Sequence, residues 1–125
     1  MTILDASAVL AFLQGEPGAD AVEAELSRGV IGAANWSEVA QKVRARGADW
    51  PLARTLLLSY GLKVAPVTEV DAERAAELWH AGTGMSLADR LCLALTDRLG
   101  VEALTADRAS STAPGVDPSR ITQLR

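Results

Sequence analysis

The chain has 125 residues, of which 49% are hydrophobic, 22% charged and 4% aromatic, and its formal net charge is −4. A chain of this size buries roughly two-thirds of its unfolded surface around one core, so we expect a single domain over residues 1–125. Its single cysteine and single histidine exclude an internal disulfide and the Cys/His clusters of closed zinc sites. The acidic balance also differs from the basic face of proteins that bind nucleic acid by charge alone.

Nothing in the sequence indicates a membrane segment. No apolar run approaches the roughly 18 residues of a membrane span, and the first residues, MTILDASAVLAFLQGEP, lack the basic start of a signal peptide. Cys92 lies in the apolar run Leu91–Leu95, where a buried reduced thiol is typical of a cytosolic protein. We therefore expect a cytoplasmic protein with no membrane association.

Short apolar runs alternate with helical segments along the whole chain, which is the pattern of a mainly parallel sheet covered by helices. The predicted strands are Thr2–Leu4, Val30–Ala33, Lys63–Val67, Glu102–Thr105 and Ile121–Leu124. These runs are short and apolar, as buried central strands are. The sequence therefore predicts an α/β fold.

Glycines, prolines and capping residues bound the predicted helices. The helices are expected at about Ser7–Leu13, up to Arg28, Asn35–Arg46, Trp50–Ser59, Thr68–His80 and Ser86–Leu99. Gly29 and Gly47 are expected to end the second and third helices, and Asp49 and Pro51 to begin the fourth. Thr68 with Asp71, and Ser86 with Asp89, have the spacing of capping boxes at the last two helix starts.

Acidic residues follow the predicted strands at the edge where open α/β sheets bind ligands. Asp5 directly follows the first strand, Glu38 comes shortly after the second, and Asp107 follows the fourth. Asp89 begins the helix that leads into the fourth strand, after a loop that contains two glycines. Four carboxylates would then meet in one pocket, where mutual repulsion raises their pKa values unless a cation neutralises them.

The expected cation is a hard one. Ligands that are all oxygen select Mg²⁺ or Mn²⁺ over zinc or copper. Such an ion makes its water more acidic, and a second ion about 4 Å away would hold the leaving oxygen of a phosphodiester. Because the chain offers no convincing side-chain nucleophile, these acids favour hydrolysis by an activated water.

Four motifs together resemble the PIN-domain ribonucleases, and among them the VapC-like toxins of type II toxin–antitoxin systems. They are Asp5 with Ser7 in LDASAVLAFL, Glu38 in ANWSEVAQK, Asp89 in SLADRLCLAL and Asp107 in LTADRA. The resemblance covers essentially the full length. It implies a three-layer α/β/α fold with a mainly parallel five-stranded sheet, and an Mg²⁺ (or Mn²⁺) site at the four acids. It also implies an endoribonuclease acting on single-stranded or looped RNA, a cognate VapB-like antitoxin and a homodimer.

The resemblance assigns a role to each motif residue. Asp5, Asp89 and Asp107 are the expected direct ligands, and Glu38 is either a ligand or a base that orients water. Ser7 and Thr105 match hydroxyl positions beside the acids, where they would orient the carboxylates. The basic residues near the acids are candidate RNA phosphate contacts, with a solvated face as an equal alternative: Lys42, Arg44, Arg46, Arg90 and Arg108.

Each acid also has a purely structural interpretation. Asp89 and Glu38 stand three residues after Ser86 and Asn35, where an acid caps the start of a helix. The alternative function is then a catalytically inactive PIN-like interaction module. A receiver-like phosphotransfer protein fits less well, since Asp5 stands alone after the first strand and no aspartate follows the third. A haloacid-dehalogenase-like phosphatase would require a second aspartate where Ser7 stands.

Overall fold

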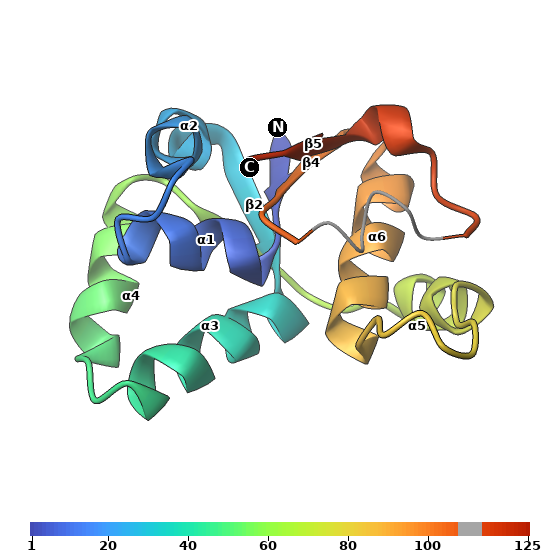
Figure 1. Cartoon of the computed structure of the whole chain (residues 1–125), viewed down its shortest axis with the longest axis horizontal. Helices are drawn as coiled ribbons and strands as arrows, with labels where there is room; N and C mark the ends of the chain where they lie inside the picture. Colours follow the sequence, from blue (N-terminus) through green and yellow to red (C-terminus); the bar gives the residue numbers. More distant parts are fainter. Residues whose placement is uncertain (108–113) are drawn as a thin grey trace.

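In the computed structural model, which describes residues 1–107 and 114–125, five strands form one parallel sheet (Figure 1). The strands are β1 (Thr2–Leu4), β2 (Gly29–Gly32), β3 (Lys63–Ala65), β4 (Glu102–Thr105) and β5 (Ile121–Gln123). Their order is β3-β2-β1-β4-β5, and every neighbouring pair is parallel. The predicted parallel five-stranded sheet is confirmed, although β2 and β3 end earlier than predicted.

Helices cover both faces of the sheet. In the described residues they are α1 (Ala6–Leu13), α2 (Ala19–Glu25), α3 (Ala33–Ala45), α4 (Trp50–Ser59), α5 (Glu69–Glu77) and α6 (Leu87–Leu99). The first four lie on one side of the sheet, and α5 and α6 lie on the other, so the predicted three layers are confirmed (Figure 1). None of the described helices is long and apolar enough to cross a membrane.

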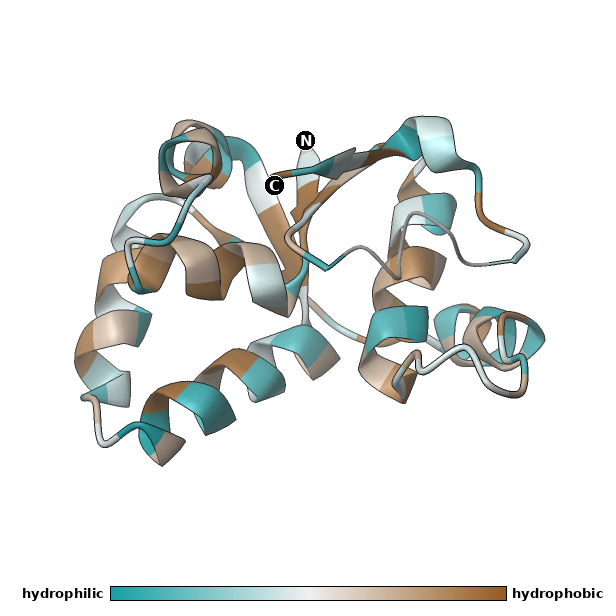
Figure 2. Cartoon of the chain, in the orientation of Figure 1, coloured by the Kyte–Doolittle hydropathy of each residue, from teal (hydrophilic) through white to brown (hydrophobic). Residues whose placement is uncertain are grey.

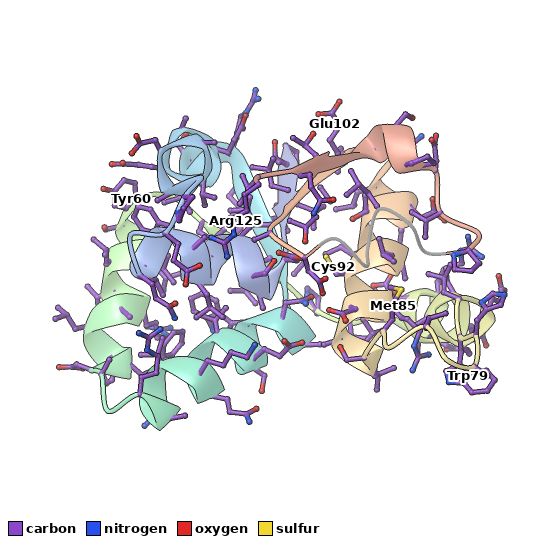
Figure 3. The ribbon with its side chains drawn as sticks, in the orientation of Figure 1. Tyr60, Trp79, Met85, Cys92, Glu102 and Arg125 are labelled. Carbon is purple, nitrogen blue, oxygen red and sulfur yellow. The ribbon has the colours of Figure 1, made fainter. Side chains whose placement is uncertain are left out.

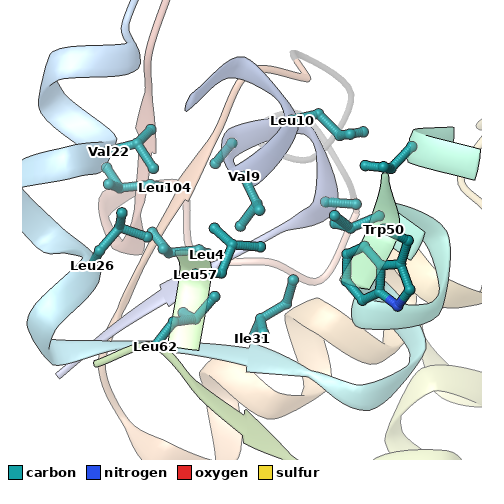
Figure 4. Close-up of a cluster of buried hydrophobic side chains, with 14 residues drawn as sticks. Leu4, Val9, Leu10, Val22, Leu26, Ile31, Trp50, Leu57, Leu62 and Leu104 are labelled. Atoms are coloured by element: carbon teal, nitrogen blue, oxygen red, sulfur yellow. The ribbon is translucent and has the colours of Figure 1, made fainter. Parts of the chain in front are cut away.

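The central strands β1 and β2 and most of β4 are buried on both faces, whereas the edge strands β3 and β5 are partly exposed. Leu4, Ile31 and Leu104 point toward α1 and its neighbours, where they join the larger hydrophobic cluster (Figure 4). Ile3, Val30 and Ala103, one position earlier in each strand, join the smaller cluster with Cys92 and Leu95 of α6. Successive side chains of a strand point to opposite faces, so three strands supply both cores, and the apolar faces of the helices turn inward (Figure 2).

Most of the predicted helix starts are confirmed by their caps. Asp49 accepts a hydrogen bond from the N–H of Leu52 at the start of α4, and Thr68 with Asp71 forms a capping box at α5. The box of Ser86 with Asp89 at α6 is also present. Local sequence determines these starts, because each cap satisfies main-chain N–H groups of its own helix.

Several helix boundaries differ from the prediction. Helix α2 ends at Glu25 and a short 3₁₀ turn, Leu26–Arg28, leads to Gly29, which begins β2 in an extended conformation; a Cβ atom there would lie 3.0 Å from Leu4 Cδ1. Helix α5 ends at Glu77, before His80. Helix α3 begins at Ala33 after Gly32, so the interpretation of Asn35 and Glu38 as a cap is wrong, and both residues lie inside the helix.

Candidate active site

The elements that carry the acids converge because β1 lies between β2 and β4 in a parallel sheet. Asp5 follows the end of β1, α3 follows β2 directly, and Thr105 is the last residue of β4. The starts of α1, α3 and α6 therefore face the same central region at one edge of the sheet (Figure 1). This is the edge at which open α/β folds bind their ligands.

The carboxylate of Asp5 is buried and held at both oxygens. Its Oδ1 accepts hydrogen bonds from the N–H of Ala8 at 2.9 Å and from the hydroxyl of Ser7 at 2.7 Å. Its Oδ2 accepts a short hydrogen bond from the hydroxyl of Thr105. Ser7 and Thr105 thus hold the carboxylate of Asp5, which is the arrangement that the resemblance to PIN-domain ribonucleases implies.

The same two hydroxyl groups hold the loop that follows β4. Ser7 Oγ accepts a hydrogen bond from the N–H of Ala106 at 2.9 Å, and Thr105 Oγ1 accepts one from the N–H of Asp107 at 2.9 Å. The main chain at Asp107 is thereby connected to Asp5 through one side chain. Arg108, a predicted RNA contact, lies outside the described residues.

Glu38 and Asp89 come from helices on opposite faces of the sheet. Glu38 lies in the second turn of α3, and no group in residues 1–107 or 114–125 makes a hydrogen bond to its buried Oε1. Asp89 accepts a hydrogen bond from the N–H of Ser86 at 3.0 Å through Oδ2. Asp89 is therefore a helix cap as well as a candidate ligand.

The pKa values indicate that three of the four acids lie close together. Burial raises the pKa of Asp5; the hydroxyls of Thr105 and Ser7 and the N–H of Ala8 oppose this effect, and the charge of Asp89 adds to it. Burial also raises the pKa of Glu38, to which Asp89 and Asp5 add while Lys42 opposes them.

The pKa of Cys92 indicates the same proximity of the three acids. Its thiol is buried on the inner side of α6, toward the middle of the molecule (Figure 3). Burial raises its pKa well above the ordinary value, and the charges of Asp5, Asp89 and Glu38 raise it further. The charges of three carboxylates that are far apart in sequence therefore act on the same thiol.

The donor set fits a hard divalent cation, although the carboxylates are not arranged around one. Within the described ranges, no group of three or more His, Cys, Asp or Glu side chains could hold a metal ion as it stands. Asp5 and Asp89 are instead engaged by N–H and hydroxyl donors. The buried Oε1 of Glu38, which no group in the described residues contacts by a hydrogen bond, leaves one carboxylate oxygen available to a cation, and carboxylate oxygens suit Mg²⁺ or Mn²⁺.

The candidate RNA contacts divide into two groups. Lys42 and Arg44 are exposed on α3, Arg46 is exposed directly after it, and Lys42 lies one turn beyond Glu38. Arg90 is engaged elsewhere, because its guanidinium donates a hydrogen bond of 2.8 Å to the carbonyl oxygen of Ala75 in the last turn of α5. Arg90 therefore attaches α5 to α6, which the sequence analysis did not anticipate.

Asn35 is a site residue that the sequence analysis misassigned. Its side chain is 1% exposed, and its Nδ2 donates a hydrogen bond of 3.3 Å to the carbonyl oxygen of Ala88. Its spacing could have identified it, because a residue three positions before Glu38 lies on the same face of a helix. Asn35 was instead interpreted as the cap of that helix.

Comparisons with known proteins agree with this architecture. Residues 2–115 match the family model of the PIN domain, whereas no curated protein matches the sequence. A toxin–antitoxin complex from Klebsiella pneumoniae has a TM-score of 0.78 at 19% identity, covering 100% of this chain and 98% of that chain.

Two further solved structures have the same fold. The sarcin-ricin loop cleaving toxin VapC20 of Mycobacterium tuberculosis has a TM-score of 0.73 at 18% identity, covering 96% of this chain and 99% of that chain. PAE2754 of Pyrobaculum aerophilum has a TM-score of 0.62 at 18% identity, covering 93% of this chain and 88% of that chain.

Proposed function

Because the chain belongs to the PIN-domain family, we propose that it is an Mg²⁺- or Mn²⁺-dependent endoribonuclease, the toxin of a type II toxin–antitoxin pair. One observation carries this proposal. The charges of Asp5, Glu38 and Asp89 act on one another and on the single thiol of Cys92 at one edge of the sheet. If each acid only stabilised its own helix, the three acids would have no reason to lie close together.

Each acid has a distinct part in the proposed site. Asp5, Asp89 and Asp107 would bind the cation, with Asp5 held in place by Ser7 and Thr105. Glu38 is suited to take up a proton from the attacking water, because burial and its acidic neighbours raise its pKa and no group in the described chain makes a hydrogen bond to Oε1. A bound Mg²⁺ or Mn²⁺ would supply neutralisation of the acids and of the phosphate oxygens.

The proposed partners follow from the same family and fold. The Klebsiella structure is a toxin–antitoxin complex, and we propose a cognate VapB-like antitoxin and a homodimer for this chain. VapC20 is a sarcin-ricin loop cleaving toxin, which supports looped RNA as the substrate class here. We also propose a single PIN-like domain over residues 1–125 that acts in the cytoplasm.

A catalytically inactive PIN-like interaction module is the second candidate. It is favoured by the caps, because Asp5 and Asp89 each accept a hydrogen bond from the N–H of their own helix start. The two candidates differ in one measurable property. Only the nuclease requires that the acids bind a divalent cation.

The test measures cleavage and cation binding on the same purified protein. A fluorescent stem-loop RNA is incubated with Mn²⁺, with Mg²⁺ or with EDTA, and the thermal unfolding temperature is recorded in each condition. The variants are Asp5→Asn and Glu38→Gln. The matched control is Asp20→Asn, which changes an exposed acid in the first turn of α2.

We expect cleavage by the wild type and the control only with Mn²⁺ or Mg²⁺, and a loss of at least about 100-fold in Asp5→Asn. Attack by water leaves a phosphate monoester and a hydroxyl at the cut ends, whereas attack by a ribose 2′-hydroxyl leaves a cyclic phosphate. Cyclic ends, or cleavage that persists in EDTA, contradict the proposal. No cleavage together with no Mn²⁺-induced rise in unfolding temperature establishes the inactive module.

A further inference from the structure

Asn35 connects the two helices that carry Glu38 and Asp89. Its side chain is buried in α3, and its Nδ2 lies 3.3 Å from the carbonyl oxygen of Ala88 in the first turn of α6. The amide can have only this orientation, since the reverse would place its oxygen against the carbonyl oxygen. One hydrogen bond thus joins the residue before Asp89 to the helical turn that precedes Glu38.

The carbonyl oxygen of the same amide is buried, and Asn35 lines a small cavity. No group in the described part of the chain makes a hydrogen bond to Asn35 Oδ1, and a Cβ atom at Gly32 would lie 3.4 Å from it. The cavity has a volume of about 10 Å³, and Ala65 and Pro66 also line it. This is about the room that one water molecule needs, and a buried amide oxygen without a hydrogen-bond partner is unfavourable.

We propose that Asn35 is a positioning residue that sets the separation of Glu38 and Asp89 by holding the first turn of α6 against α3. A single water bound in the cavity at Oδ1 completes the hydrogen bonds of its amide. An apolar side chain of this size would fill the same space, but it would not fix where α6 begins relative to α3. This role rests on the proposed function, because the separation of the two acids matters only if they share a cation.

The test separates positioning from stability. Asn35→Leu removes the hydrogen bond to Ala88 while retaining the size of the side chain, and Asn35→Ser serves as a second variant that cannot reach Ala88. The matched control is Val43→Ala, which creates a cavity in the same helix within the larger hydrophobic cluster. Mn²⁺ affinity is measured by titration calorimetry, and amide hydrogen exchange is followed along α6.

We expect the Asn35 variants to bind Mn²⁺ about tenfold more weakly than Val43→Ala, with faster exchange confined to the first turn of α6. Equal Mn²⁺ affinity in Asn35→Leu and Val43→Ala overturns the positioning role and leaves the nuclease proposal standing. A wild type that binds no Mn²⁺ overturns both. A high-resolution crystal structure with no water at Asn35 Oδ1 overturns the second half of the inference.

Discussion

The hydroxyl of Thr105 donates a hydrogen bond to Asp5 Oδ2, and it accepts one from the N–H of Asp107 at 2.9 Å. The register of the sheet explains this contact, because Leu4 of β1 pairs with Leu104 of β4, so the next residue of each strand emerges at the same level. One side chain therefore holds the first acid and also the loop that bears the fourth.

Replacing Thr105 by valine tests this arrangement, because the substitution retains the shape of the side chain and removes only its hydroxyl. Asp5 then loses a donor inside the protein, so we expect a loss of about 1–3 kcal/mol in the free energy of unfolding and a loss of about tenfold or more in RNA cleavage.

Urea denaturation and a cleavage assay measure the two effects. Thr122→Val is the matched control, because Thr122 is exposed on β5 and pairs with Leu104; it should change stability by less than about 0.5 kcal/mol. Equal losses in the two variants would show that the hydroxyl of Thr105 has no special role.

The elements that local sequence determines were predicted well. The caps at Asp5, Asp49 and Ser86 each use a side chain to satisfy N–H groups within three residues, and Gly100 ends α6 with a φ of 64°. Such contacts depend on neighbouring residues alone. Three of the four candidate acids follow strands that are adjacent in the sheet, so their placement at one end of the sheet was predictable, whereas their role in a cation site stays a prediction.

The contacts that depend on packing between helices were not predicted. The hydrogen bond of Asn35 to Ala88 spans 53 positions, and that of Arg90 to Ala75 crosses from α6 to α5. Neither pair has a sequence pattern, because the relative placement of two helices depends on the sheet between or beneath them. The contact of Arg90 with Ala75 was not anticipated for this reason, and the role of Arg90 as an RNA contact stays a prediction.

Glu38 should make the stability of the metal-free protein fall as the pH rises. Its pKa in the folded protein is raised by burial and by Asp89, so the folded state holds the proton more tightly than the unfolded state does. Its favourable contribution is therefore fully present below the ordinary carboxyl pKa of about 4 and is lost as the pH rises through the raised value. Glu38→Gln removes this dependence.

Urea denaturation from pH 4 to pH 8 in EDTA checks the sign. We expect the free energy of unfolding of Glu38→Gln to rise relative to that of the wild type as the pH rises, by less than about 1 kcal/mol, because a partly exposed group is screened. In an Asp89→Asn background the gain should shrink, since one of the charges that raises the pKa is absent. A gain that is independent of pH would contradict the electrostatic explanation.

The buried pair of Asp71 and Arg98 should hold α5 to α6 more strongly than its exposed neighbour does. Arg98 Nε lies 2.7 Å from Asp71 Oδ1, and the Asp71 side chain is 3% exposed. The second pair, between Arg74 and Asp97 at 3.1 Å, has the Asp97 side chain 52% exposed. We expect Asp71→Asn to lose about 2 kcal/mol and the matched Asp97→Asn to lose less than about 1 kcal/mol.

The pH dependence of this loss has the opposite sign to that of Glu38. Burial acts to raise the pKa of Asp71, but the hydrogen bonds from Arg98 and Thr68 outweigh it and hold the value below the ordinary one. The stability that Asp71 confers is therefore present above a pH of about 4 and is lost as the pH falls through its lowered pKa. The wild type and Asp71→Asn should converge in acid, as chemical denaturation at several pH values will reveal.

Lys42 should contact RNA phosphate, because it is exposed on α3 one turn beyond Glu38 and its charge reaches that acid. The matched control is Lys63, which begins β3 and therefore lies at the amino ends of the parallel strands, away from the candidate site. With a catalytically blocked Asp5→Asn background, the affinity for a stem-loop RNA is measured by fluorescence anisotropy over a range of salt concentrations. We expect Lys42→Gln to reduce the slope of log affinity against log salt by about 1, and Lys63→Gln to leave it unchanged. Equal slopes in the two variants would place the RNA elsewhere than along α3.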